Sequence, residues 1–178
     1  MSSQPLATKG SDWIHYSLSH NSLGLLLLAH SQRGVCYLSM GDQLPLLESQ
    51  LLNKYPQAQR LDTDTDLQKL LATTNAFIET PKTQLDLALD LRGTPFQLQV
   101  WQALKGIPIG TTTTYAVIAQ RLNTPNAVRA VASACAANSI ALAIPCHRVI
   151  TSHGTLSGYR WGVERKAELL RRESARLP

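Results

Sequence analysis

The sequence predicts an α/β (α+β) protein in two parts, 1–92 with alternating strands and helices and 93–178 with mainly helices, including a helix-turn-helix. Apolar residues in the first part switch between period-two alternation and helical spacing, whereas the second part keeps helical spacing with recognisable caps. The charge also changes at this boundary. Residues 1–92 hold seven Lys/Arg and nine Asp/Glu, while 93–178 hold ten and three. A polyanionic partner is therefore expected for the second part alone.

Composition limits the location of the protein. The longest apolar run, Leu23 to Ala29, is seven residues and is far too short to cross a bilayer. The first ten residues are polar and do not resemble a secretory signal. Three cysteines form an odd set without disulfide-type spacing, which suits a reducing compartment. We expect a cytoplasmic protein with no membrane partner.

The first part begins with strand-like segments. Strands are predicted at 13–18, 23–29, 34–39 and 85–91, with a hairpin across 30–33. Helices are predicted at 45–55, starting near Asp42 or Gln43, and at 67–80 with Asp66 as cap. His15, His20 and His30 lie among Ser and Asn and are interpreted as surface residues. This part shows no phosphate loop and no metal-ligand motif, so a supporting role is expected.

The second part begins with a helix. Thr94 caps it and Pro95 fits its first turn. Its apolar stripe predicts a core position for Trp101, and 107–110 forms a turn. The stripe consists of Phe96, Val100, Trp101 and Leu104.

A helix-turn-helix follows. Thr114 caps a helix over 115–122, a turn covers 123–126, and Thr124 with Pro125 starts a second helix to about Ala137. One face of that helix, expected in the core, holds Val128, Val131 and Cys135, which makes Cys135 structural. The opposite face carries small side chains except for one long cation. It consists of Arg129, Ala130, Ser133, Ala136 and Ala137.

That small face has two interpretations. It either packs against a neighbouring helix or approaches a nucleic-acid backbone closely. Reading bases in the major groove usually takes several long polar side chains, and this face offers only Arg129. Minor-groove binding, with one side chain inserted into the base stack, fits the pattern better.

The candidate nucleophile is Cys146, within Pro145-Cys146-His147-Arg148 and between the apolar segments 140–144 and 149–150. A thiolate is a soft nucleophile that accepts a carbon electrophile. Sequence neighbours on an extended chain point to opposite faces, so contact between thiol and imidazole requires a turn or a bridging water. A buried structural cysteine is the alternative.

Glu173 lies in a basic C-terminal helix, on the flank of an expected apolar stripe formed by Val163, Ala167 and Leu170. A carboxylate at the edge of such a stripe can point into the core and reach a histidine. By itself it equally fits an exposed residue beside Arg171, Arg172 and Arg176.

Pro-Cys-His-Arg, Asn138 eight residues earlier, and the segments 129–138 and 154–162 together resemble the O6-alkylguanine-DNA alkyltransferase family, in particular its Ada-type catalytic domains. The likeness is strong from Gly93 to Glu173 and weak before that. It implies a ribonuclease-H-like support domain over 1–92. For 93–178 it implies a winged-helix-like DNA-binding and catalytic domain.

The resemblance implies DNA repair by direct damage reversal. The alkyl group on O6 of guanine, or O4 of thymine, would pass irreversibly to Cys146 after the base is flipped out of double-stranded DNA. His147 would act as base through a water, and Glu173 would orient it. The protein would act once, as a monomer, without a cofactor.

Further roles are implied by the same resemblance. Tyr115 would turn the nucleotide out and Arg129 would fill the gap, with Ala130, Ser133 and Ala136 facing DNA. Asn138 would hold the turn around the cysteine. Tyr115, Tyr159 and Arg160 would line the base pocket, and the carbonyls of Cys146 and Val149 would accept from the guanine amine. Arg160 departs from the Ser found in some relatives.

Some relatives bind zinc in the first part. Since Cys36 is the only cysteine before Cys135, no such metal site is expected. A self-methylating transcription switch is not expected either. Two other classes stay open: a non-catalytic alkylated-DNA-binding protein, which would lack the nucleophile, and a cysteine hydrolase, which would need an oxyanion hole and turnover and would leave Arg129 unexplained.

Overall fold

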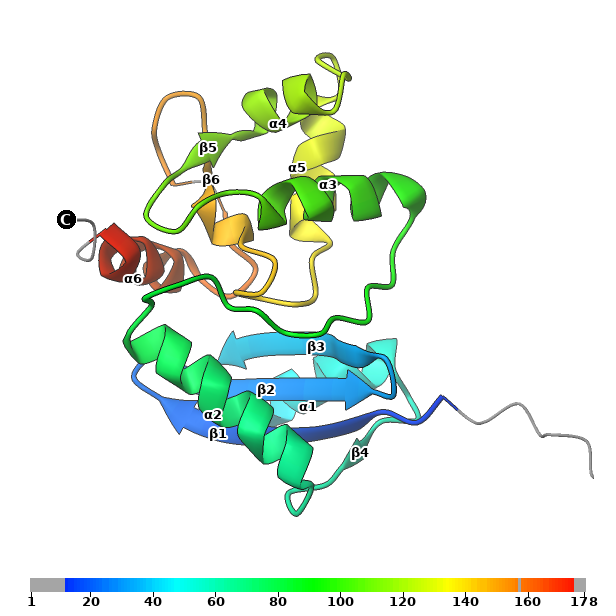
Figure 1. Ribbon diagram of the computed structural model, residues 1–178. Coiled ribbons are helices and arrows are strands. Elements are labelled where there is room, and N and C mark those ends of the chain that lie inside the picture. The colour runs from blue at the N-terminus through cyan, green and yellow to red at the C-terminus, as the bar shows by residue number, and fades with distance from the viewer. Residues whose placement is uncertain (1–11, 157, 175–178) are drawn as a thin grey trace, which may run out of the picture.

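The computed structural model describes residues 12–156 and 158–174. It is a mixed α/β structure. A four-stranded sheet with two helices forms one part, and a mainly helical part lies beside it (Figure 1). No helix in the described ranges is both long and apolar enough to cross a membrane.

The sheet has the order β3-β2-β1-β4. Its strands are β1 (His15–Asn21), β2 (Gly24–Ser31), β3 (Gly34–Gly41) and β4 (Gln59–Arg60). The first three pair antiparallel, and β4 pairs parallel to β1. The predicted hairpin between β2 and β3 is confirmed, but its turn is shorter because β2 continues through Ser31. Gly34 is required there, since its φ is +134° and an added Cβ would lie 2.4 Å from the Ala88 carbonyl oxygen.

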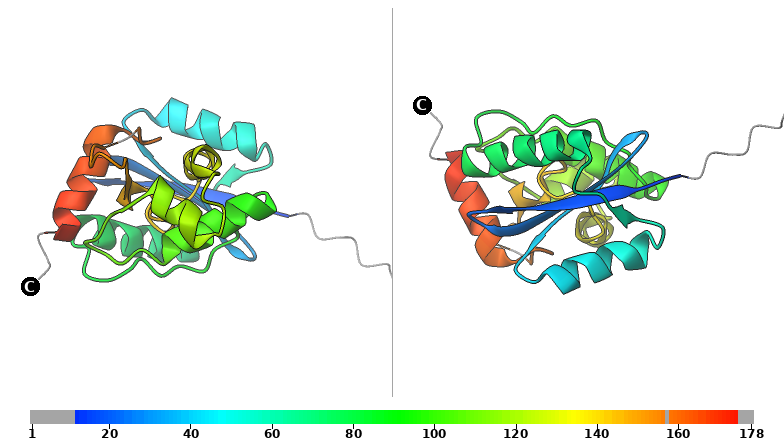
Figure 2. Two further views of the ribbon diagram at one scale, coloured as in Figure 1. Left: turned by 90° about the horizontal axis from the view of Figure 1, so that it is seen from above. Right: turned by 90° about the horizontal axis from the view of Figure 1, so that it is seen from below.

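Two helices cover opposite faces of the sheet (Figure 2). Helix α1 (Leu44–Lys54) packs Leu47 and Leu51 against one face, and α2 (Thr65–Glu79) packs Leu67 and Leu71 against the other. Both were predicted. The cap of α2 was assigned wrongly to Asp66. Asp64 is the cap, and its carboxylate accepts from the backbone N–H groups of Asp66 and Leu67, while Asp66 already lies in the first turn.

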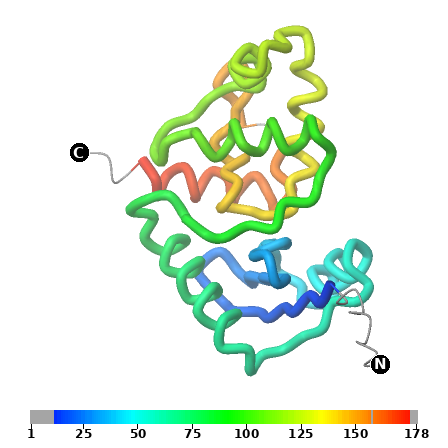
Figure 3. Tube along the Cα trace, turned by 45° about the vertical axis from the view of Figure 1, so that its right-hand side comes forward, coloured from blue at the N-terminus to red at the C-terminus, as the bar shows by residue number. Residues whose placement is uncertain are grey.

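The prediction of a strand over 85–91 is wrong. Only Leu89 forms a bridge, to Val35 at the β3 edge. The rest of this connection crosses between the sheet and the helical part (Figure 3). The edge of β3 is shared, because Leu38 pairs with the segment around Ile140. The segments around Leu89 and Ile140 therefore each pair with a short length of the β3 edge, and neither forms a strand.

The first helix of the second part is α3 (Pro95–Lys105), with Thr94 as its cap, as predicted. Thr94 and Gln97 also form a capping box, which was not predicted. Trp101 is buried, and its indole Nε1–H donates to the Ala134 carbonyl over 2.8 Å. Since Ala134 lies in α5, this bond ties the two helices together.

The predicted helix-turn-helix is present as α4 (Tyr115–Arg121), capped by Thr114, and α5 (Val128–Ala136). The start of α5 at Thr124 was wrong, because 124–127 form a turn closed by a bond from the Ala127 N–H to the Thr124 carbonyl. Val128 is consequently 37% exposed and not in the core, while Val131 and Cys135 are buried.

The strands β5 (Thr113–Thr114) and β6 (Val149–Ile150) pair parallel, and helix α6 (Val163–Ser174) ends the described chain. Its predicted apolar face is wrong. Val163 and Ala167 are exposed, and the buried residues are Lys166, Leu169 and Glu173. The helix is rotated so that two charged side chains point inward, where each finds a partner.

The histidines of the first part differ from expectation. His20 is exposed as predicted, but His30 is only 9% exposed and His15 is half-buried. Both lie on paired positions of β1 and β2, where Trp13 packs against their rings. The surface assignment is therefore wrong for His30.

One apolar cluster runs across the predicted boundary at residue 92. It joins Leu26 and Leu38 of the sheet with Val100 of α3 and Ile140 beyond α5. The sheet and the helices thus form one continuous core, and the candidate site lies on the helical side of it.

Candidate active site

Cys146 lies in a tight turn. Residues Cys146–Arg148 form a short 3-10 helix after Pro145, and all three are buried. The backbone N–H of Cys146 donates to the Ile144 carbonyl over 2.8 Å. The turn that contact between neighbouring thiol and imidazole requires is therefore present.

Asn138 holds this turn from the inside. Its Nδ2 donates to the Ile144 carbonyl at 3.0 Å and to Cys146 Sγ at 3.3 Å, and its Oδ1 accepts from the Ile140 N–H at 2.9 Å. The side chain is 1% exposed. One residue at the end of α5 thus fixes both the backbone and the sulfur of the cysteine segment.

Helix α6 brings Glu173 to His147. The His147 Nε2 and Glu173 Oε1 atoms are 2.8 Å apart, and both side chains are buried. The second ring nitrogen, Nδ1, has no hydrogen-bond partner among the described residues. An imidazole oriented by a carboxylate on one nitrogen and open on the other can accept a proton there.

The sequence analysis did not predict the role of Arg148. It is fully buried, its Nε donates to Glu173 Oε2 at 2.9 Å, and its Nη2 donates to Oε1 at 2.8 Å. Its Nη1 donates to Gln84 Oε1 at 2.5 Å and to the Ile107 carbonyl at 2.8 Å. A long cation inside an otherwise apolar stretch was the available signal, because a buried guanidinium needs an acidic partner.

The electrostatics give each group one protonation state at neutral pH. Burial alone would raise the pKa of Glu173, but hydrogen bonds from His147 and Arg148 outweigh it and lower that pKa to about 2. Burial lowers the pKa of His147 more than Glu173 raises it. Burial also raises the pKa of Cys146, although Asn138 and Lys166 oppose it. At rest the site holds a thiol, a neutral imidazole and a carboxylate.

Cys146 borders a cavity of about 460 Å³. Its lining includes four other residues that were predicted for the site, and it adds Ala132, Cys135 and Gly158. The full lining is Tyr115, Ala132, Cys135, Ala136, Cys146, Gly158, Tyr159 and Arg160. Cys135, expected to be only structural, is buried and also borders the cavity. The hydroxyl of Tyr159 is buried and has no partner among the described residues.

Val149 does not line the cavity beside Cys146. Its carbonyl accepts from Nζ of Lys166, a buried lysine of α6, over 2.7 Å. A carbonyl has two lone pairs, so a second donor can still bind there. Lys166 was not predicted, although it lies on the same helical face as Glu173. Arg160 is exposed and its Nη1 donates to the Asn138 carbonyl over 3.3 Å, which links the 158–160 segment to the cysteine turn.

The small face of α5 is exposed. Arg129, Ala130, Ser133 and Ala136 all face solvent, and Ala136 also borders the cavity. Ala137, which was assigned to the same face, is half-buried and packs against the core, whereas the other four residues are not covered by another helix of the described chain. An exposed surface of small residues with one long cation therefore lies beside the cavity that Cys146 borders.

Comparisons with known proteins agree with this geometry. The family described as "6-O-methylguanine DNA methyltransferase, DNA binding domain" matches residues 95–175. The bifunctional transcriptional activator/DNA repair enzyme Ada of Escherichia coli K12 is 50% identical over 161 residues, which are 90% of this chain and 46% of Ada. The methylated-DNA–protein-cysteine methyltransferase of Mycobacterium bovis is 48% identical over 104 residues, 58% of this chain and 63% of that protein. The chain spans about half of Ada.

A solved structure extends the likeness to the first part of the chain. OGT of Mycobacterium tuberculosis, crystallised in complex with DNA, matches with a TM-score of 0.78 at 36% identity, over 92% of this chain and 95% of that one. Since the match covers the sheet as well as the helices, and since sequence and fold agree with the same group of proteins, the chain belongs to the O6-methylguanine-DNA methyltransferase family.

Proposed function

We propose that this chain repairs alkylated double-stranded DNA by moving an alkyl group from O6 of guanine, and O4 of thymine, to Cys146. The observation that carries the proposal is a buried thiol at a cavity, held by Asn138 and adjacent to a neutral histidine that is paired with Glu173. The match to proteins named for this reaction supports it.

The chemistry follows from the protonation states. The thiol proton leaves toward Nδ1 of His147, through a water, and the thiolate attacks the alkyl carbon. A C–S bond forms as the C–O6 bond breaks, and the electron pair passes to the base, which gains a proton as guanine. Glu173 orients the ring and stabilises its protonated form. The thioether has no route back, so each chain reacts once.

The DNA contacts are proposed from the same surface. The exposed face of α5 approaches the minor groove, with Ala130, Ser133 and Ala136 allowing close contact. Arg129 enters the stack where the nucleotide leaves, and Tyr115 crowds the phosphate. An extruded base is needed, because a buried thiol cannot reach an atom inside the duplex.

The base would occupy the cavity beside Cys146. Tyr115, Tyr159 and Arg160 line it, and the buried hydroxyl of Tyr159, without a partner in the described part of the chain, is available to the purine. The carbonyls of Cys146 and Val149 would accept from the guanine amine. No cofactor takes part, and the protein acts as a monomer.

Finer features of the fold are proposed in the same terms. The sheet order, with β4 parallel to β1, supports a ribonuclease-H-like unit over 1–92. The small β5-β6 sheet beside α3, α4 and α5 supports a winged-helix-like unit over 93–178. Three cysteines with free thiols support a reducing, cytoplasmic location.

The test is single-turnover transfer from methyl-labelled duplex DNA, followed by peptide mapping. With excess DNA, label should stop near one methyl group per chain and map to Cys146. Cys146→Ser should abolish transfer while still binding DNA, and Cys36→Ser, at a buried cysteine of β3, should transfer normally.

Three outcomes would contradict the proposal. Label on Cys135, which also borders the cavity, would move the nucleophile. Sustained turnover would indicate a cysteine hydrolase, and DNA binding without transfer would indicate a damage-sensing protein.

A further inference from the structure

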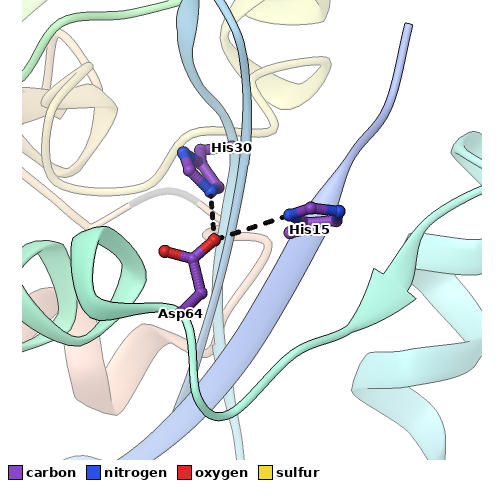
Figure 4. Close-up of side chains that lie close together, drawn as sticks. All are labelled: His15, His30 and Asp64. Atoms are coloured by element: carbon purple, nitrogen blue, oxygen red, sulfur yellow. Dashed lines mark hydrogen bonds and ion pairs between the residues drawn. The ribbon is translucent and has the colours of Figure 1, made fainter. Parts of the chain in front are cut away.

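Three polar side chains outside the active site converge at the start of α2. His15 of β1 and His30 of β2 are directly paired across the two strands, and Asp64 precedes α2. Both rings point toward the Asp64 carboxylate (Figure 4). They lie on the face of the sheet that α2 covers, away from Cys146 and its cavity.

Two of the three distances between the possible ligand atoms match those that a tetrahedral metal ion imposes. Asp64 Oδ2 is 3.1 Å from His30 Nε2 and 3.5 Å from His15 Nδ1, and the three atoms all lie within 4.8 Å of one another. Zinc binds nitrogen and oxygen at about 2.0–2.2 Å with tetrahedral geometry, which separates two ligand atoms by roughly 3.4 Å. The distances from Asp64 Oδ2 to His30 Nε2 and to His15 Nδ1 are close to this value. The His15 distance is long for a hydrogen bond, so hydrogen bonding alone does not explain the convergence.

The surroundings fix these ligands. Asp64 Oδ1 accepts from the backbone N–H groups of Asp66 and Leu67 at 2.9 and 3.1 Å, which leaves Oδ2 for the histidines. Trp13 packs on both rings, with centroid distances of 4.5 Å to His15 and 5.3 Å to His30. Oriented ligands of this kind raise metal affinity, because little freedom is lost on binding.

The cluster is also accessible. The exposed fractions of the side chains are 26% for His15, 16% for Asp64 and 11% for His30. An ion can therefore enter, and a water can complete its coordination. Two imidazoles and one carboxylate suit zinc and its neighbours in the first transition row rather than magnesium or calcium, which prefer oxygen.

We propose that His15 Nδ1, His30 Nε2 and Asp64 Oδ2 bind one divalent transition-metal ion of the zinc class, with water as the fourth ligand. The ion links two strands to the beginning of a helix, at positions far apart in the chain. Its role is to stabilise the sheet part of the molecule. The site contains no cysteine and is independent of alkyl transfer. It departs from the sequence-based expectation that this chain has no metal site.

The experiment is a titration of the metal-stripped full chain with Co²⁺, followed by displacement with Zn²⁺. One equivalent of Co²⁺ should give visible d–d bands without a thiolate charge-transfer band, because no sulfur coordinates. Zn²⁺ in excess should raise the melting temperature by about 5 °C.

The variants are chosen to preserve the fold. Asp64→Asn keeps the helix cap, since Asn caps as well as Asp, but loses the anionic ligand. His15→Gln changes a half-buried position. Each should weaken Co²⁺ binding at least about 10-fold. His20→Ala, at an exposed histidine of the same strand, should bind as the unmodified chain does.

Three results would overturn the proposal. They are no Co²⁺ binding at micromolar concentrations, a thiolate band that places the ion at a cysteine, and unchanged affinity in both ligand variants. Alkyl transfer is expected to be the same with and without the metal, so failure of the metal site leaves the proposed repair activity untouched.

Discussion

His147 shows how burial sets the protonation of a single residue. Its ring is fully enclosed, so the charged form loses solvation, and this lowers its pKa although Glu173 lies 2.8 Å away. Burial has the largest effect on this pKa. Arg148, which forms two hydrogen bonds to the same carboxylate, adds a smaller effect in the same direction.

This protonation predicts a pH-dependent stability. The folded pKa of His147 is below its unfolded value of about 6.5, so below that pH the unfolded chain binds a proton that the folded chain does not. The free energy of unfolding should therefore fall as the pH drops from 7 to 5, with a limiting slope of about 1.4 kcal/mol per pH unit. Urea unfolding at several pH values measures this.

Two variants separate this residue from the other histidines. His147→Asn should flatten the slope between pH 7 and 5, and His153→Asn, at an exposed position, should leave it unchanged. Equal slopes in all three proteins would show that His147 is not the titrating group. Glu173 titrates in a lower window. Its pKa is lowered to about 2, so its stabilising contribution is fully present above about pH 4.5 and is lost as the pH falls toward 2.

Helix α5 has two faces, one packed in the core and the other exposed to solvent. Its inner face holds Val131 and Cys135 in the core, and its last turn leads into Asn138 and the cysteine segment. Its outer face is exposed and nearly all small. Arg129 lies there without a hydrogen bond or ion pair to any other described residue, so it is free to bind something outside the chain.

Arg129→Ala is expected to slow repair of duplex DNA sharply while the rate with free O6-benzylguanine stays nearly intact. The reason is that a free base needs no extrusion, so it does not use a wedge. Single-turnover rates on both substrates measure the effect.

The matched control is Lys105→Ala, which removes the same charge from an exposed position at the end of α3. If Lys105 contacts a phosphate, its loss lowers the affinity for DNA equally for all base sequences. The dependence of that affinity on salt concentration also becomes weaker. Equal losses on duplex and free base in Arg129→Ala would mean that Arg129 supports the pocket or the fold, and the extrusion role would be wrong.

At the scale of the whole molecule, the connection between the sheet and the helices takes part in the site. Gln84 lies in that connection. Its Oε1 accepts from Arg148 Nη1, and its Nε2 donates to the Ile107 carbonyl over 2.8 Å. Since Arg148 holds Glu173, and Glu173 holds His147, the position of the proposed general base depends on the contact between the two parts of the chain.

Gln84→Ala should lower the free energy of unfolding by about 1–3 kcal/mol, because a buried guanidinium N–H loses an acceptor. It should also slow alkyl transfer to both duplex and free base, in contrast to Arg129→Ala. Denaturant unfolding and transfer rates measure the two effects. Gln102→Ala, at an exposed position of α3, is the control. Unchanged transfer in a destabilised Gln84→Ala protein would limit Gln84 to a structural role.

Features that depend on neighbours along the chain could be predicted from the amino-acid sequence. Caps at Thr94 and Thr114, the β2-β3 hairpin and most helix ranges follow from local hydrogen bonding and apolar spacing. The proposed nucleophile is also a local feature, because Pro145, Cys146 and His147 are consecutive residues and form a single turn.

The contacts between side chains far apart in sequence became known from the three-dimensional structure. The pairing of Arg148 with Glu173 and Gln84, the inward rotation of α6, and the convergence of His15, His30 and Asp64 join residues far apart in sequence. The segment 85–91 alternates like a strand, yet the β3 edge left it a single bridge. Such contacts depend on which buried charges can pair and on which strand edges are already hydrogen-bonded. The periodicity of apolar residues along the chain predicts neither.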